Sequence, residues 1–183
     1  MTGLRLIPLR CAACQGRLSA PTGAAVLVCA ECGAGFEVMP DGSLVPVSVS
    51  FARYAKQSER FYPFWTFEAR LRLTARESNH PPSASGGLGA RFRERGSLRL
   101  YCAAFPGDIE GNGKWSLHLT GEQPELTPVP PPKDLEPIAF SQAEARLLAS
   151  DLFVTSELQL PDTVRTLEFQ LELADPRIVA MTL

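Results

Sequence analysis

The sequence predicts an α+β protein in which a small zinc ribbon precedes an antiparallel sheet with one or two covering helices. Three observations carry this prediction. Two pairs of closely spaced cysteines lie within residues 11–32, later segments alternate apolar and polar side chains, and a capping box at Ser141 introduces an amphipathic stretch. We therefore divide the 183 residues into a ribbon at 1–42, a linker or extended connector at 43–60, and an α+β domain at 61–183.

Each cysteine pair has the spacing of a zinc knuckle. Cys11 and Cys14 form the first CxxC motif, and Cys29 and Cys32 form the second, after a gap of fourteen residues. Because a CxxC turn aims two thiolates at one ion, we predict that these four residues bind a single structural Zn²⁺. Four thiolates leave no coordination position for water or substrate, so the metal is predicted to stabilise the fold and not to catalyse a reaction.

Rubredoxin-like iron sites use the same four-cysteine chemistry, but commonly with a longer gap and with glycine after both pairs. Here Gly33 follows the second pair, whereas Gln15 follows the first. The sequence therefore favours zinc.

Short extended segments surround the knuckles. Residues 24–28 and 35–38 are predicted as strands that enter and leave the second knuckle. A turn signal at 40–43 leads into 44–50, which is either a strand or an extended connector. Residues 51–60 then form either a short helix or an irregular link.

Two strands open the α+β domain. Strict alternation from Trp65 to Thr74 is typical of a half-buried strand, and alternation resumes from Ser97 to Phe105. The intervening residues 77–96 are predicted as a long loop, so we expect the two strands to pair as a long-looped hairpin. Five aromatic residues fall within 61–67, and they form either part of the core or an exposed surface for a partner protein.

The secondary structure of the next three segments is predicted with different degrees of definition. Residues 108–120 fit either a strand or a weak helix capped by Asp108, since glycines disfavour the helix. Six prolines make 124–137 extended or irregular. The capping box of Ser141 and Glu144 predicts a helix over 142–152.

Two more strands are predicted at the C-terminal end. Thr166–Leu173 alternates, Asp175 and Pro176 turn the chain, and Arg177–Leu183 forms the last strand. We expect Thr166–Leu173 to neighbour the strand that begins at Trp65. The outward-facing residues that suggest this pairing are Arg70 and Arg72 on one strand and Glu168 and Glu172 on the other.

Charge is unevenly distributed along the chain, whose net charge is −2. Residues 51–101 hold ten basic side chains against four acidic ones, and Arg91, Arg93 and Arg95 in this basic stretch suit phosphate contacts. The alternative function is therefore a nucleic-acid-associated zinc-ribbon module. Residues 102–183 hold thirteen acidic side chains against five basic ones, which weighs against a polyanionic partner.

Neither a membrane span nor a secretory leader is predicted, because no apolar run is long enough and the N-terminus lacks a cleavage pattern. Five cysteines, four of them in close pairs, are typical of metal binding in a reducing compartment. We expect the protein to be cytoplasmic.

No residue pattern indicates catalysis, so an enzyme is not expected. Cys102 lies on the apolar side of a predicted strand, which indicates a buried, inert thiol and not a nucleophile paired with His80 or His118. The glycine-rich run 107–114 lacks the spacing of a phosphate-binding loop.

The cysteine ribbon is followed by the aromatic segment 62–65, the Ala104–Phe105 segment, the helix opening at Ser141 and a terminal strand. This order resembles that of uncharacterised bacterial proteins with an N-terminal zinc ribbon, and the resemblance implies the architecture alone. We expect a non-catalytic interaction or assembly protein, in which the ribbon and the α+β domain contact partner proteins in a larger complex.

Overall fold

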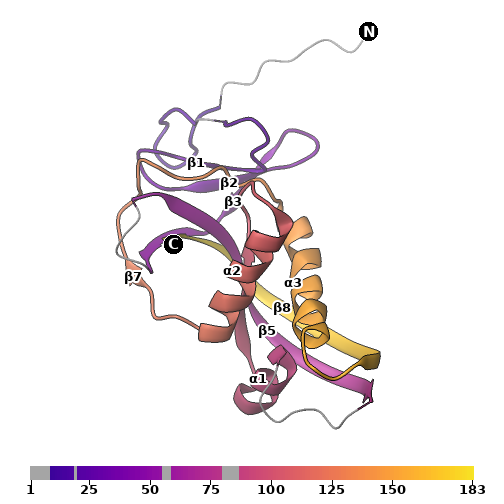
Figure 1. The fold of residues 1–183 in the computed structure, drawn as a ribbon. Coiled ribbons are helices and arrows are strands. Elements are labelled where there is room, and N and C mark those ends of the chain that lie inside the picture. The colour runs from indigo at the N-terminus through magenta and orange to yellow at the C-terminus, as the bar shows by residue number, and fades with distance from the viewer. Residues whose placement is uncertain (1–8, 19, 55–58, 80–86) are drawn as a thin grey trace.

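The structure is a computed structural model that describes residues 9–18, 20–54, 59–79 and 87–183. These residues form an α+β fold, as predicted (Figure 1). One sheet contains, in order, β1 (Val26–Val28), β2 (Gly35–Val38) and β3 (Leu44–Val47). The larger sheet contains, in order, β6 (Leu98–Ala103), β5 (Phe61–Ser78), β8 (Val164–Thr182), β4 (Val49–Arg53) and β7 (Thr127–Pro128). The helices are α1 (Gly87–Arg95), α2 (Ile109–Glu122) and α3 (Gln142–Leu158).

The small antiparallel sheet belongs to the ribbon, and Figure 1 shows it at one end of the molecule. The segment 43–60, expected as a linker or extended connector, contributes strands to both sheets. β3 pairs with β2, and after Ser48 the chain continues as β4, which lies parallel to β8. The helix considered for 51–60 does not form over 51–54, since β4 runs to Arg53, and residues 55–58 lie outside the described residues.

The two longest strands, β5 and β8, form the centre of the large sheet as an antiparallel pair. Arg70 lies opposite Glu172, so the charge pattern identified the correct neighbours, whereas Glu168 lies opposite Ala75. The predicted turn at Asp175 is wrong, because β8 continues through it to Thr182. Asp175 adopts a φ of +47° where the register shifts, so a bulge accommodates a proline that cannot donate to the ladder.

β6 pairs with β5, which confirms the predicted hairpin partners, but the connection between them is not a continuous loop. β5 extends to Ser78 and α1 begins at Gly87, while residues 80–86 lie outside the described residues. The glycines that suggested a loop admit a carboxylate to the start of α1. A Cβ atom on Gly87 would lie 2.5 Å from Glu157 Oε1, and the N–H of Gly89 donates to that oxygen over 2.9 Å.

The ambiguous segment 108–120 is helical. Asp108 caps α2, as the helix alternative required, and its side chain accepts a hydrogen bond from the Gly111 N–H. Hydroxyl groups of α2 bind the open edge of β6, and these tertiary contacts outweigh the low helix propensity of its glycines. The helix predicted over 142–152 is confirmed with its complete capping box, and α3 runs on to Leu158.

The aromatic segment 61–67 belongs to the core. Phe64, Trp65 and Phe67 are each 0% exposed, and Trp65 Nε1 donates to the Phe140 carbonyl over 2.8 Å. Of the two interpretations of this segment, part of the core or an exposed surface for a partner protein, the structure supports the first. α1 and α3 pack on the face of the sheet that carries Trp65 and Phe67.

The ribbon packs directly on this core. Val26 of β1 belongs to the same buried cluster as Trp65, and the N–H of Ala25 donates to the Ile138 carbonyl over 2.7 Å. The Glu37 carboxylate of β2 accepts a 2.8 Å hydrogen bond from the Gln142 N–H at the start of α3. The ribbon and the α+β region therefore share buried contacts.

Candidate metal centre

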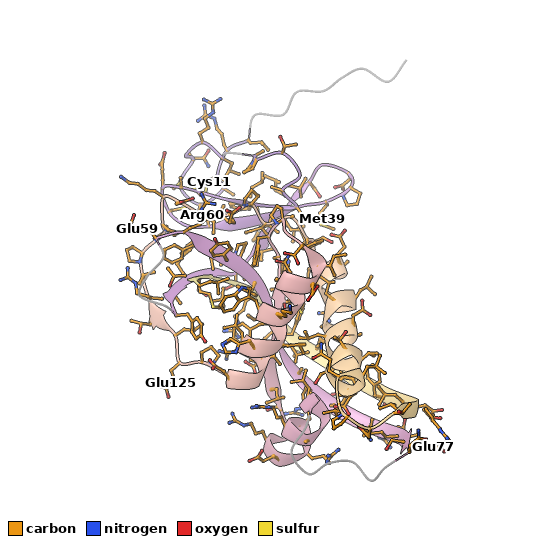
Figure 2. All side chains as sticks on the ribbon, in the orientation of Figure 1. Cys11, Met39, Glu59, Arg60, Glu77 and Glu125 are labelled. Atoms are coloured by element: carbon orange, nitrogen blue, oxygen red, sulfur yellow. The ribbon has the colours of Figure 1, made fainter. Side chains whose placement is uncertain are left out.

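The structure brings the four predicted metal ligands together in the ribbon. The Sγ atoms of Cys11, Cys14, Cys29 and Cys32 all lie within 4.8 Å of one another. Cys11 Sγ is 3.6 Å from Cys32 Sγ, and Cys14 Sγ is 3.6 Å from Cys29 Sγ. Figure 2 places Cys11 at the end of the molecule opposite to Glu77 of β5.

The spacing of the sulfurs fits a tetrahedral metal ion. Zinc–sulfur bonds of about 2.3 Å at tetrahedral angles would place the sulfurs about 3.8 Å apart, close to the shorter of the observed separations. A disulfide requires about 2.05 Å between its sulfurs, and all five cysteines are free. The four thiols are thus arranged to hold one metal ion, and the arrangement is compatible with zinc.

The two knuckles have the same backbone geometry. The N–H of Gln15 donates to the Cys11 carbonyl, and the N–H of Gly33 donates to the Cys29 carbonyl, both over 2.8 Å. In each knuckle the N–H of the first cysteine also donates to the carbonyl five residues further on, over 2.9 Å. The same turn therefore occurs twice, which places two thiols on each side of the site.

The residue after each knuckle adopts the left-handed conformation. Gly33 has a φ of +76° and Gln15 has a φ of +63°. Glycine reaches this region without steric cost, whereas a residue with a Cβ atom does so only where its surroundings hold it there. The second knuckle has the residue type its geometry favours, and the first adopts the same geometry with glutamine.

Ionisation of the thiols is interdependent. Burial opposes ionisation of Cys11, but backbone hydrogen bonds, that from Cys14 foremost, outweigh it and lower its pKa to about 7. At Cys14 the backbone of Gly16 favours the thiolate, yet the thiols of Cys32 and Cys29 raise its pKa to about 12. One thiolate forms readily and opposes the next, and a bound cation would offset this repulsion.

A small apolar cluster supports the site. Leu18, Leu27 and Phe36 are each at most 5% exposed and pack with the two buried ligands, Cys11 and Cys29. Cys14 and Cys32 are exposed. One ligand of each knuckle is thus anchored in the ribbon interior, while the other faces solvent.

The other thiol, Cys102, is buried as predicted. It lies in the main core, and burial raises its pKa to about 12. His118 is exposed on α2, where its Nε2 lies 2.9 Å from the Tyr54 hydroxyl, which donates to Glu122 over 2.7 Å. His80 lies outside the described residues. The structure thus gives Cys102 and His118 different surroundings and does not assemble a thiol–imidazole pair from them.

The glycine-rich run 107–114 does not form a phosphate-binding loop. Asp108 occupies the N-cap of α2, and its carboxylate accepts the N–H of Gly111 that an anion would otherwise use. Lys114 Nζ lies 2.6 Å from Glu110 one turn earlier. The run therefore forms the N-cap and the first turns of α2.

Sequence reasoning missed a buried ion network at the end of α3. Arg76 of β5 lies 3.1 Å from the Glu157 carboxylate and 2.8 Å from that of Asp162, and all three side chains are at most 7% exposed. Glu157 also accepts the Gly89 N–H at the start of α1. The network joins β5, α1 and α3, which are distant in sequence, so no local pattern marks it.

Sequence reasoning also missed a cavity of about 400 Å³ between α2 and α3. Its floor includes Cys102 of β6, and its walls include Leu117, Leu148 and Leu152. α2 and α3 lie side by side in Figure 1, and the cavity forms where both helices meet β6.

Comparisons with known proteins add no assignment. No family model, no curated protein and no solved structure matches the chain. Within the part of the chain that the structure describes, no helix combines the length and the hydrophobicity needed to span a membrane.

Proposed function

We propose that the protein is a non-catalytic interaction or assembly protein, and that Cys11, Cys14, Cys29 and Cys32 bind a structural Zn²⁺ that fixes its contact surface. The observation that supports it best is the exposure of three large apolar side chains on the β2–β3 hairpin, Val38 and Val45 on its two opposite faces and Met39 where β2 ends. Val38, Met39 and Val45 are 38%, 37% and 44% exposed. Figure 2 shows Met39 at the ribbon end of the molecule, where Cys11 also lies.

The β2–β3 hairpin is held by contacts with the metal site and with α3. Val45 pairs in register with Glu37, and Glu37 holds the start of α3. Phe36, one residue earlier, is 5% exposed and packs against the cysteines. A rigid hairpin loses little conformational entropy on binding, and a partner protein that contacts the hairpin would remove its exposed apolar side chains from water.

The proposal also places the protein in a compartment where cysteine thiols stay reduced. Zinc held by four thiolates requires thiols that are kept reduced, which fits the cytoplasm and does not fit an oxidising compartment. Partner proteins in a larger complex would then meet the ribbon with its metal bound.

A matched pair of surface variants tests the proposal. Val45→Glu places a charge on the β2–β3 hairpin, and Leu158→Glu places one on a more exposed apolar residue at the C-terminal end of α3, which is 60% exposed. Affinity capture from the native host with zinc-loaded protein should return partners that Val45→Glu loses and Leu158→Glu keeps. If the wild-type chain returns no specific partner, or both variants lose it equally, the proposal fails.

Nucleic acid binding is the second candidate, and the exposed arginines Arg93 and Arg95 of α1 favour it. Two other arginines of the basic stretch are already engaged. Arg99 lies 2.7 Å from Glu68, and Arg91 donates to the Gly121 carbonyl. Fluorescence anisotropy at low salt with labelled single- and double-stranded oligonucleotides tests this candidate, which requires binding that Arg93→Ala and Arg95→Ala together weaken.

A further inference from the structure

The cavity between α2 and α3 has the size of a ligand site. Its volume of about 400 Å³ falls within the usual range for small-molecule pockets, about 300–1,000 Å³. A dry cavity of about 150 Å³ accommodates benzene, so this one has room for an aromatic ring with a short chain attached. Residues of α2, α3 and β6 line it.

The cavity is present because several of the residues that face it are small. Where α2 faces the cavity it presents Gly113 and Ser116, and β6 presents Cys102 and Ala103. A Cβ atom built on Gly113 would meet no other atom within 4 Å. Small residues on two adjoining elements therefore create the hollow, which packing of larger side chains would have closed.

The interior of the cavity is apolar. Leu117 of α2, Phe140, and Leu148 and Leu152 of α3 supply its walls. Ile109 at the α2 end is 91% exposed and extends the apolar surface outward from the rim. An apolar body placed inside would exchange contact with water for contact with these side chains.

The rim of the cavity carries an excess of negative charge. Two carboxylates, Glu110 and Asp151, and one ammonium group, Lys114, line it. Lys114 forms its ion pair with Glu110. Among the described residues Asp151 has no ion pair, so one carboxylate at the mouth is available to a cation.

We propose that the α2–α3 cavity binds a small amphiphilic amine, whose apolar body fills the space above Cys102 and whose ammonium group binds Asp151. Thr155 and Gln159 on the same side of α3 offer further hydrogen-bond acceptors at the mouth. A fatty acid of the same size would place its carboxylate against Asp151 and bind more weakly. This site is separate from the metal centre and from the exposed apolar residues of the β2–β3 hairpin.

Three probes of equal size test the proposal by isothermal titration of the full-length, zinc-loaded chain. They are phenylbutylamine, phenylbutanol and phenylbutanoate, which differ only in the charge of the head group. The amine should bind with one site per chain, the alcohol more weakly and the carboxylate most weakly. Equal affinity for the amine and the carboxylate, or no heat from the amine at millimolar concentration, overturns the proposal.

Variants then locate the site. Asp151→Asn should weaken the amine about two- to fivefold, as expected for an exposed ion pair, and leave the alcohol unchanged. Glu94→Gln removes a carboxylate from α1 and serves as the matched control. Gly113→Leu should weaken both ligands by about tenfold or more because its side chain occupies the cavity, while Gly113→Ala should weaken them less.

Circular dichroism and thermal melting of each variant verify that it is folded before binding is interpreted. If Gly113→Leu does not fold, Cys102→Met, which extends into the cavity from the floor, replaces it. Amine binding that survives a folded cavity-filling variant, or that does not respond to Asp151→Asn, assigns the binding to another surface and refutes the proposal.

Discussion

The Thr120 hydroxyl of α2 accepts a 3.0 Å hydrogen bond from the backbone N–H of Tyr101 in β6. Ser116 of the same helix accepts from the Ala103 N–H over 3.0 Å, and Gln123 at its C-cap accepts from the Arg99 N–H over 2.9 Å. Residues 99, 101 and 103 are alternate positions of an edge strand, whose outward N–H groups lack a neighbouring strand. α2 therefore satisfies the open edge of the large sheet with side chains, which protects it from pairing with another chain.

Replacing Thr120 tests this edge protection. Thr120→Val keeps the shape of the 0% exposed side chain but leaves the Tyr101 N–H without its acceptor. We expect a loss of about 1–3 kcal/mol in the free energy of unfolding, the usual cost of an unsatisfied buried donor. Thr120→Ser keeps the hydroxyl and should lose less. Urea denaturation measures both, and equal stabilities of the two variants would contradict the role of the hydroxyl.

Gly33 is required at the point where the ribbon meets the α+β region. It has a φ of +76°, and a Cβ atom there would lie 2.9 Å from Pro131 Cγ and 3.1 Å from a ring carbon of Phe51. Gly33→Ala therefore adds a steric clash to the cost of about 1–2 kcal/mol for a left-handed residue with a side chain.

The matched control is Gly42→Ala. Gly42 has a φ of +81°, but a Cβ atom there meets nothing within 4 Å. Thermal melting of both variants should show the larger decrease for Gly33→Ala. Equal decreases in melting temperature would mean that Pro131 moves away from the added methyl group without a cost in stability.

The buried network around Arg76 predicts a pH dependence of stability. A hydrogen bond from Arg76 is the main cause that lowers the pKa of Asp162 below its ordinary value of 3.8. The folded protein thus favours the ionised carboxyl, and the unfolded chain binds the proton more tightly. The stabilisation is present above the ordinary pKa and is lost as the pH falls through the lowered value.

Asp162→Asn removes this titration. The wild type should have the higher urea midpoint of unfolding at neutral pH. Its advantage over the variant should shrink as the pH falls below 3.8. Asp151→Asn, at an exposed carboxylate, serves as the control for the loss of a negative charge. A difference that stays constant with pH would show that Asp162 does not act through its charge.

Metal removal should destabilise more than the ribbon. Plasma emission spectrometry of purified protein should find one zinc per chain, and iron in its place would contradict the assignment. Cys29→Ser should abolish stoichiometric binding and unfold the ribbon, and the shared contacts of Val26 and Ile138 should also lower the melting temperature of the remaining sheet. Cys102→Ser, outside the site, should retain the metal.

Several elements could be predicted because their signal is local. The CxxC turns need only residues three apart to aim two sulfurs at one point, and the capping box of α3 lies within four residues, Ser141 to Glu144. The alternation from Trp65 likewise marks a strand that the structure confirms. In each case the residues that determine the local geometry are neighbours in the sequence.

Predictions went wrong where distant contacts decide the local structure. The glycines of 77–96 indicated a loop, but α1 forms because Ser156 and Glu157, some seventy residues away, accept the N–H groups of Leu88 and Gly89 at its start. Asp175 and Pro176 indicated a turn, but pairing with β5 on both sides of the bulge keeps β8 in one sheet. α2 remained ambiguous in the sequence because its main contacts are with the edge of β6.

The sequence by itself determined the metal site as a set of ligands: four thiols in two turns, each placed by its own backbone. Only the tertiary structure decided where that site lies, against Pro131 and the start of α3, and only it created the cavity above Cys102. The physical reason is the range of the interactions. A knuckle is closed by hydrogen bonds within five residues, whereas a cavity is what remains between helices and strands after they have packed.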